Sequence, residues 1–159
     1  MIRKSLQRFS EQIVLDQHGR LPSRQRSFRM TLIDPAVRFL EHWREGVTTR
    51  MLVSAATGAA QLCVFEQWVA PGSGAPTHVH PVEEVLTVLA GEAEIWIEDQ
   101  PCAVKAGQSV LVGAGRRHGF RNSGTSELHI HAILARPVFE ALPDGATEMT
   151  RRWDAPRKE

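Results

Sequence analysis

The sequence predicts an all-β fold, a barrel or sandwich built from many short strands. Beyond Met51, short segments rich in Val, Ile, Leu and aromatic residues follow one another, separated by glycine, proline or asparagine turns. An arrangement of glycine turn, apolar strand, glycine turn and histidine also occurs twice, in 72–91 and 107–122. Many short strands at regular spacing are typical of barrels, and a barrel of this size encloses a ligand cavity.

Length and composition limit the class of protein. A chain of 159 residues, 42% of them apolar, is long enough for one core and too short for two comfortable domains. Its formal net charge of +1 gives no global basic field for nucleic acid. No apolar run approaches the roughly 20 residues that span a bilayer, and no signal peptide is visible. Two cysteines, Cys63 and Cys102, form no disulfide framework. We therefore expect a cytoplasmic protein with no nucleic-acid or membrane partner.

Residues 1–29 are expected to form a basic N-terminal arm. They contain seven Lys or Arg against two acidic residues, a formal charge of +5. Leu6, Phe9 and Ile13 recur at helical spacing, which indicates a short amphipathic helix that is solvated or docks on the domain. A translation start at Met30 would instead make the arm non-native.

The segment 34–46 is predicted to be a short helix. Asp34 is a suitable N-cap and Pro35 a suitable first helical residue. Apolar residues then follow at helical spacing up to Gly46, namely Val37, Leu40 and Trp43.

Strands are predicted from Met51 onward. In 61–70 the residues alternate between two faces, and the turn residues 71–74 close the strand. Two further strands, 84–90 and 92–98, are expected to form a hairpin about Gly91. The remaining strands are predicted at 103–105, 109–112, 115–121 and 127–136.

The last part of the chain is predicted to leave the barrel. One helical turn is expected at 139–142, and 144–159 is expected to be a polar tail that packs loosely or not at all. The barrel domain is thus predicted to span residues 30–143.

Ligand-type residues cluster in the first of the two repeated arrangements. His78 and His80 are two residues apart, so in an extended chain both imidazoles leave the same face. Glu84 can reach that face after a bend at Pro81. Two imidazoles and a carboxylate are the ligand set of a two-His-one-carboxylate metal site. His118, which ends the second arrangement, supplies a fourth candidate ligand for the same ion.

Other polar and aromatic residues have weaker assignments. Glu83 directly precedes Glu84, so in a strand its side chain points to the opposite face and is expected to be solvated. His129 and His131 share one strand face, where structural or rim roles are expected; His131 is the first candidate for a second-shell or proton-transfer partner. Trp68 and Trp96 fit a core or dimer contact as well as a substrate pocket.

The two histidine arrangements resemble the two motifs of the cupin superfamily. Every ligand position is filled at the family's spacing, over roughly residues 60–135. Gly113 stands where the family usually has proline, a change in a turn that leaves the ligands alone. The first motif is matched by Gly72, His78, His80, Glu84 and Gly91, and the second by Gly107, Gly115, His118 and Asn122.

This resemblance implies a double-stranded β-helix, or jelly-roll barrel, of the small single-domain cupin type. It also implies a metal inside the barrel, held by His78, His80, Glu84 and His118. Three neutral imidazoles and one carboxylate leave a divalent ion with net positive charge and, at six coordination, two open positions. The ligand set accepts Fe, Mn, Ni or Zn and does not choose among them.

The open positions favour a metal-dependent enzyme whose small oxygenated organic substrate chelates the ion. The reaction is either a dioxygenase-type oxidative cleavage with Fe(II) or a non-redox isomerase or lyase reaction with Mn, Ni or Zn. Glu84 could serve as both ligand and base. The absence of tyrosine argues against cupin epimerases and lyases that use a tyrosine acid or base.

The alternative is a non-enzymatic cupin that senses or stores a small ligand in the same pocket. The basic arm is too short to form a helix-turn-helix domain with its own core, which argues against a transcription factor. The resemblance also implies a homodimer formed by pairing of barrel strands.

Overall fold

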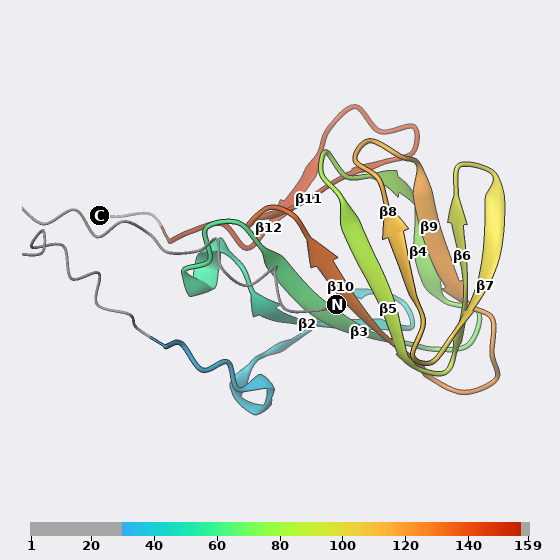
Figure 1. Ribbon diagram of the computed structural model, residues 1–159, viewed down its shortest axis with the longest axis horizontal. Coiled ribbons are helices and arrows are strands. Elements are labelled where there is room, and N and C mark those ends of the chain that lie inside the picture. Colours follow the sequence, from blue (N-terminus) through green and yellow to red (C-terminus); the bar gives the residue numbers. More distant parts are fainter. Residues whose placement is uncertain (1–29, 157–159) are drawn as a thin grey trace, which may run out of the picture. The chain divides into compact units, whose positions relative to one another are not determined.

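The computed structural model describes residues 30–156, and from Ile33 onward the chain forms one compact unit of two six-stranded antiparallel sheets (Figure 1). In spatial order, the first sheet contains β1 (Leu40–Arg44), β2 (Val47–Val53), β3 (Cys63–Val69), β10 (Leu128–Leu134), β5 (Glu84–Ala90) and β8 (Ser109–Val112). The second sheet contains β12 (Thr150–Arg152), β11 (Phe139–Pro143), β4 (Gly74–Val79), β9 (His118–Asn122), β6 (Glu92–Ile97) and β7 (Gln100–Lys105). The predicted all-β fold is confirmed.

One apolar core lies between the two sheets. In β10, Leu128, Ile130, Ala132 and Leu134 are buried, and the residues between them are only half-buried. This alternation is the period of two that a strand with one core-facing side requires. The same core cluster includes Ile95 from the second sheet. Each fully buried Leu or Ile side chain contributes about 1.5–3 kcal/mol, so the facing sheets are held together mainly by this burial.

The predicted hairpin about Gly91 is wrong, although both of its strands and its turn are present. Strand β5 pairs with β10 and β8, whereas β6 pairs with β7 and β9. Gly91 (φ +82°) therefore marks a corner where the chain passes from one sheet to the other. A Cβ atom there would lie 2.9 Å from the carbonyl oxygen of Glu127, so the corner also needs the close approach that glycine permits.

The helix predicted at 34–46 is wrong beyond its first turn. Asp34 does cap a short 3₁₀ helix, η1 (Pro35–Val37), by accepting a 2.9 Å hydrogen bond from the backbone of Ala36. The backbone is extended at Arg38, and the chain then enters β1, which pairs with β2. Sheet pairing outweighs the helical spacing of the apolar residues. A second 3₁₀ helix, η2 (Ala55–Thr57), follows β2.

The C-terminal part also differs from its prediction. The segment expected as a helical turn is strand β11, which buries Phe139 and Ala141. Strand β12 pairs with β11, and Trp153 packs against the core. The sheet therefore continues past residue 143 into the segment expected to be a polar tail.

The remaining expectations concern the two cysteines, the N-terminal arm and the location of the protein. Cys63 is buried and Cys102 is exposed, and neither forms a disulfide. The predicted basic arm, 1–29, lies outside the described residues. Within residues 30–156 no helix has the length and apolar character needed to cross a bilayer. The homodimer and the cytoplasmic location stay predictions.

We predict that Gly74→Ala destabilises the fold, because Gly74 in β4 lies directly against the backbone of β9. An added Cβ would lie 2.0 Å from the carbonyl oxygen of Phe120 and 2.6 Å from the Cα of Arg121, and backbone atoms cannot move aside cheaply. The expected loss is about 1–3 kcal/mol of unfolding free energy, measured by urea denaturation with tryptophan fluorescence. Gly113→Ala is the control, since its Cβ would meet only a side-chain carbon of Arg116 at 3.6 Å. Equal stabilities of the two variants would contradict this packing.

Candidate metal centre

The register of two strands brings the first and last predicted ligands together. Strands β4 and β9 are antiparallel, and His78 is the direct partner of His118. A bulge between Ala75 and His78 re-aims the end of β4 at this point. His80 follows β4 in the loop, and Glu84 is the first residue of β5 in the opposite sheet. The site therefore lies where the two sheets approach each other.

Backbone contacts hold the loop that contains His80. The N–H of Gly115 donates a 2.9 Å hydrogen bond to the carbonyl of His80, which ties the second motif to the first. Strand β11 supports the loop from the other side, since the carbonyl of Glu140 accepts a hydrogen bond from Nδ1 of His80.

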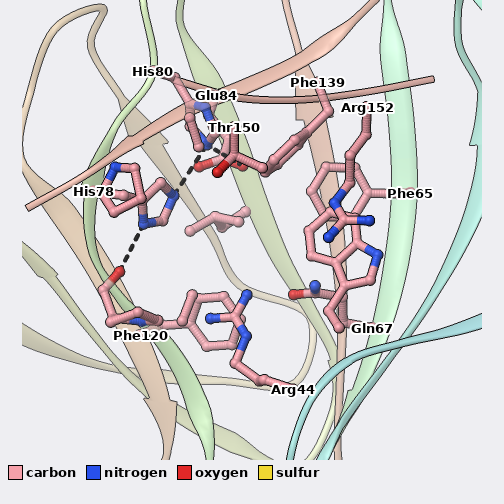
Figure 2. Close-up of a pocket in the computed structure, with 16 residues that line it drawn as sticks. Arg44, Phe65, Gln67, His78, His80, Glu84, Phe120, Phe139, Thr150 and Arg152 are labelled. Atoms are coloured by element: carbon pink, nitrogen blue, oxygen red, sulfur yellow. Dashed lines mark hydrogen bonds and ion pairs between the residues drawn. The ribbon is translucent and has the colours of Figure 1, made fainter. Parts of the chain in front are cut away.

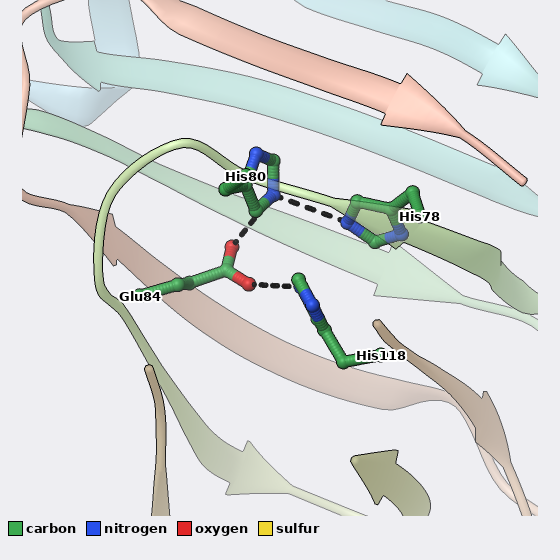
Figure 3. Close-up of side chains that lie close together, drawn as sticks. All are labelled: His78, His80, Glu84 and His118. Carbon is green, nitrogen blue, oxygen red and sulfur yellow. Dashed lines mark hydrogen bonds and ion pairs between the residues drawn. The ribbon is translucent and has the colours of Figure 1, made fainter. Parts of the chain in front are cut away.

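The four predicted ligands converge on one point (Figure 3). One ligand atom from each of His78, His80, Glu84 and His118 lies within 4.8 Å of the others. Nε2 of His78 is 3.1 Å from Nε2 of His80. Glu84 lies between His80 and His118. Its Oε1 is 3.6 Å from Nε2 of His80, and its Oε2 is 2.9 Å from Nε2 of His118.

A hydrogen bond at Nδ1, the ring nitrogen that faces away from the site, fixes the tautomer of each imidazole. Nδ1 of His78 lies 2.8 Å from the carbonyl oxygen of Pro76, and Nδ1 of His118 lies 2.8 Å from that of Arg116. Nδ1 of His80 contacts the carbonyl oxygen of Glu140. A carbonyl oxygen only accepts, so all three Nδ1 atoms carry a proton. In each neutral ring the lone pair is therefore on Nε2, facing the site.

Burial and charge set the protonation of the four groups. Burial and the neighbouring His80 and His118 lower the pKa of His78 to about 4. Burial also lowers the pKa of His80. For Glu84 burial is the largest single effect and acts to raise the pKa, but the hydrogen bond with His118 and the charges of the three histidines together lower it below its usual value. The same contact raises the pKa of His118 against the effect of burial. His78 and His80 are thus neutral at pH 7, beside an ionised carboxylate.

This arrangement fits a divalent cation. Two neutral imidazoles, both protonated on Nδ1, present their Nε2 lone pairs to each other at 3.1 Å. Two acceptors at that distance repel unless a positive charge lies beside both of them. The donor set of three imidazoles and one carboxylate suits Mn, Fe, Ni or Zn, and the geometry does not select among them. Within the described residues the set is complete for one ion.

A pocket with aromatic walls leads to the centre (Figure 2). Its volume is about 270 Å³, and His78, His80 and Glu84 line one end of it. His80 and His118 are 1% exposed and Glu84 is 3% exposed, whereas His78 is half-buried, so three of the four groups are shielded from bulk water. The walls are formed by Trp43, Phe65, Leu86, Phe120, Phe139 and Ala141.

Several residues considered from the sequence lie outside the pocket. His131 belongs to the face of β10 opposite its core-facing residues, so the geometry does not favour the proton-transfer role predicted for it. His129, on the same face, contacts Glu66 at 2.8 Å and stacks on Trp68. Trp96 donates a 3.0 Å hydrogen bond to Thr77 and does not line the pocket either.

The pocket walls were missed from the sequence, for identifiable reasons. Trp43 and Phe139 fell in segments predicted to be helical. Arg152 fell in the predicted tail, and a bulge in β1 alters the alternation before Arg44. Phe120 could have been found, because it is two residues from His118 in the same strand and shares its face.

Comparisons with known proteins agree with this fold. Residues 65–134 match the family model described as "Cupin domain". Protein SchB from Streptomyces halstedii is 34% identical over 113 residues, which cover 67% of this chain and 82% of SchB. Polyketide synthase CurC from Streptomyces cyaneus is 30% identical over 96 residues, covering 60% of this chain and 55% of CurC.

Solved structures show the same architecture. The polyketide cyclase RemF from Streptomyces resistomycificus superposes with a TM-score of 0.63 at 22% sequence identity. The match covers 76% of this chain and 89% of RemF. At that identity the likeness establishes the fold.

We predict that His78→Ala and His118→Ala each lower metal affinity by more than about tenfold. Loss of an outer hydrogen-bond partner already costs about 10–100-fold, and loss of the ligand itself costs at least as much. His131→Ala is the matched control, because His131 lies outside the cluster. Metal content is measured by elemental analysis of protein purified without added metal. Equal content in all four proteins would refute the ligand assignment.

Proposed function

The chain belongs to the cupin superfamily, and on that premise we propose that it is a metal-dependent enzyme that closes a ring in a small polyketide-like substrate. The reaction is a non-redox condensation, so the proposal takes the lyase or isomerase branch expected from the sequence and not the dioxygenase branch. The observation that carries it is a complete metal-ligand set at the buried end of an aromatic-walled pocket.

The shape and lining of the pocket support a flat, partly apolar substrate. Trp43, Phe65 and Phe139 form one cluster of rings whose centroids lie 4.8–5.7 Å apart, and all three line the pocket. Phe120 lines the pocket from β9. Aromatic faces at these separations favour stacking on a planar conjugated group. A chain of alternating ketones and its cyclised product both present such groups.

The names of two of the similar proteins support the same substrate class. CurC is named a polyketide synthase and RemF a polyketide cyclase. Neither name establishes an activity for this chain, and the chain spans only 55% of CurC. They favour polyketide chemistry over the other small-molecule reactions considered from the sequence.

His78, His80, Glu84 and His118 would hold the ion. When bound, a divalent ion supplies Lewis acidity that makes a carbon next to a polarised carbonyl easier to deprotonate. The chain supplies the remaining requirements. The buried end of the pocket excludes water, which otherwise competes with the internal nucleophile. The aromatic walls hold the substrate folded, so that its nucleophilic carbon and the receiving carbonyl lie close together.

Glu84 is the residue proposed to move the proton. Its two oxygens have different neighbours, Oε1 toward His80 and Oε2 toward His118, so one oxygen can remain free when the other is a ligand. The free oxygen accepts the proton from the substrate carbon. That carbon forms a bond to the distant carbonyl carbon, whose oxygen is then protonated. The new carbon–carbon bond closes the ring, and the resulting hydroxyl group then leaves as water together with a second proton from the nucleophilic carbon, so that no oxidant is consumed.

We predict that the metal-loaded protein converts a linear phenyl-substituted triketone to phenylresorcinol and water. Removal of the metal by a chelator, or His118→Ala, is expected to lower the rate by at least about 100-fold, because Lewis-acid stabilisation is worth several kcal/mol. His131→Ala is expected to retain the wild-type rate. Product is measured by mass spectrometry as the loss of one water, with dissolved oxygen followed in parallel.

The same assay separates the alternatives. Oxygen uptake with an oxidised product would replace the proposal by the dioxygenase reaction. A ligand-induced rise in melting temperature, without turnover of this or related di- and triketones, would replace it by the sensing or storage role.

A further inference from the structure

A second polar group lines the pocket at its exposed end. Arg44 and Arg152 both line the cavity that leads to the metal ligands (Figure 2). Arg44 is exposed and the side chain of Arg152 is 38% exposed, whereas His80 and Glu84 are buried. The pocket therefore has a buried end with the metal ligands and an accessible end with two guanidinium groups.

A backbone irregularity aims Arg44 at the pocket. In a regular strand Trp43 and Arg44 would point to opposite faces of the sheet. The pairing of β1 with β2 instead shifts register between His42 and Arg44, and both Trp43 and Arg44 line the pocket. Bulges are a common means of re-aiming a side chain next to a functional site.

The two arginines have few partners in the described part of the chain. Arg44 donates one hydrogen bond, to the carbonyl of Gly74 at 3.1 Å, and forms no ion pair there. Arg152 stacks on Trp43 at 4.7 Å, and its buried Nε has no hydrogen-bond partner. A guanidinium has five N–H donors, so most of the donors of this pair remain available to a ligand.

One carboxylate lies nearby, and it is already engaged. Glu41 accepts hydrogen bonds from the indoles of Trp43 at 3.0 Å and Trp153 at 2.8 Å. Its contact with Nη1 of Arg152 is longer, at 3.6 Å. Among the described residues Arg44 has no ion pair and Arg152 has only this longer one, which leaves positive charge at the pocket mouth uncompensated. Partial burial of the guanidinium, and then the charge of the neighbouring Arg152, lower the pKa of Arg44.

We propose that Arg44 and Arg152 form an anion subsite that binds a carboxylate group of the substrate, at the opposite end of the pocket from the metal ligands. The planar guanidinium fork matches the two oxygens of a carboxylate. A neutral substrate would leave both cations uncompensated at the mouth. The inference rests on the proposed function for what reacts at the buried end, and it adds that the substrate is an acid whose carboxylate stays outside the reacting centre.

The test compares a negatively charged probe with its uncharged methyl ester. The acid probe is para-acetoacetylbenzoate, which has a diketone at one end and a carboxylate at the other, and the neutral probe is its methyl ester. Binding to the full-length protein is measured by isothermal titration calorimetry, in the zinc-loaded and in the chelator-treated form. We expect the acid to bind about 10–100-fold more tightly than the ester in both forms, as hydrogen bonds between charged groups predict.

Substitution of the arginines should remove that preference. Arg44→Gln and Arg152→Gln are each expected to weaken binding of the acid by about tenfold or more and to leave the ester unchanged. Arg121→Gln is the control, because Arg121 is an exposed arginine that pairs with Glu94 and does not line the pocket. Melting curves verify that each variant is folded. If Arg152→Gln does not fold, the result with Arg44→Gln decides whether the subsite exists. Arg44→Gln is expected to fold, because the side chain of Arg44 donates only one hydrogen bond, to a backbone carbonyl.

The outcomes are distinct from those of the proposed function. Equal affinity of wild-type protein for acid and ester, or an acid preference that survives Arg44→Gln, would overturn the anion subsite even if ring closure occurs. Preference for the acid in the chelator-treated protein, lost in the arginine variants, would establish the subsite even if no triketone is cyclised.

Discussion

The orientation of three imidazoles is the constraint on which the functional site depends. Carbonyl oxygens of Pro76, Arg116 and Glu140 accept hydrogen bonds from the three Nδ1–H groups, and the Nε2 lone pairs therefore point inward toward one another and toward Glu84. Such an arrangement is unfavourable without a shared positive charge. Strand pairing and core burial fix the backbone independently of the site, so the geometry is preorganised and would suit a bound metal ion.

Chemical character changes along the pocket from the buried to the accessible end. The metal ligands lie where water is excluded, the aromatic rings form the walls, and the arginines Arg44 and Arg152 lie at the mouth. A substrate that is conjugated in the middle and anionic at one end would be oriented by this order alone. Orientation matters for ring closure, because a flexible chain of ketones can cyclise in several ways and the pocket must favour one.

Sequence patterns predicted local features well and long-range partners poorly. Strand 84–90 and the convergence of His78, His80, Glu84 and His118 were predicted from alternation and motif spacing. These patterns depend on a few neighbouring residues. The pairing of β5 with β10 could not follow from them, because the same apolar alternation suits a hairpin and a corner between sheets. Segment 34–46 was mispredicted for a related reason, since Trp43 satisfies helical spacing and is placed in a strand by its partner β2. Arg44 and Arg152 could not be predicted as pocket residues, because a bulge in β1 and the late strand β12 place them there. No local sequence pattern indicates either feature.

The most direct measurement is anomalous X-ray scattering from crystals of the metal-loaded protein, recorded at the absorption edge of the metal found by elemental analysis. We expect a single strong peak in the barrel, at about 2.0–2.2 Å from Nε2 of His78, His80 and His118 and from one oxygen of Glu84. The Nε2 atoms of His78 and His80, 3.1 Å apart here, would remain on the same side of the ion. A fully loaded protein whose anomalous peak lies away from these four side chains would contradict the metal centre and the chemistry built on it.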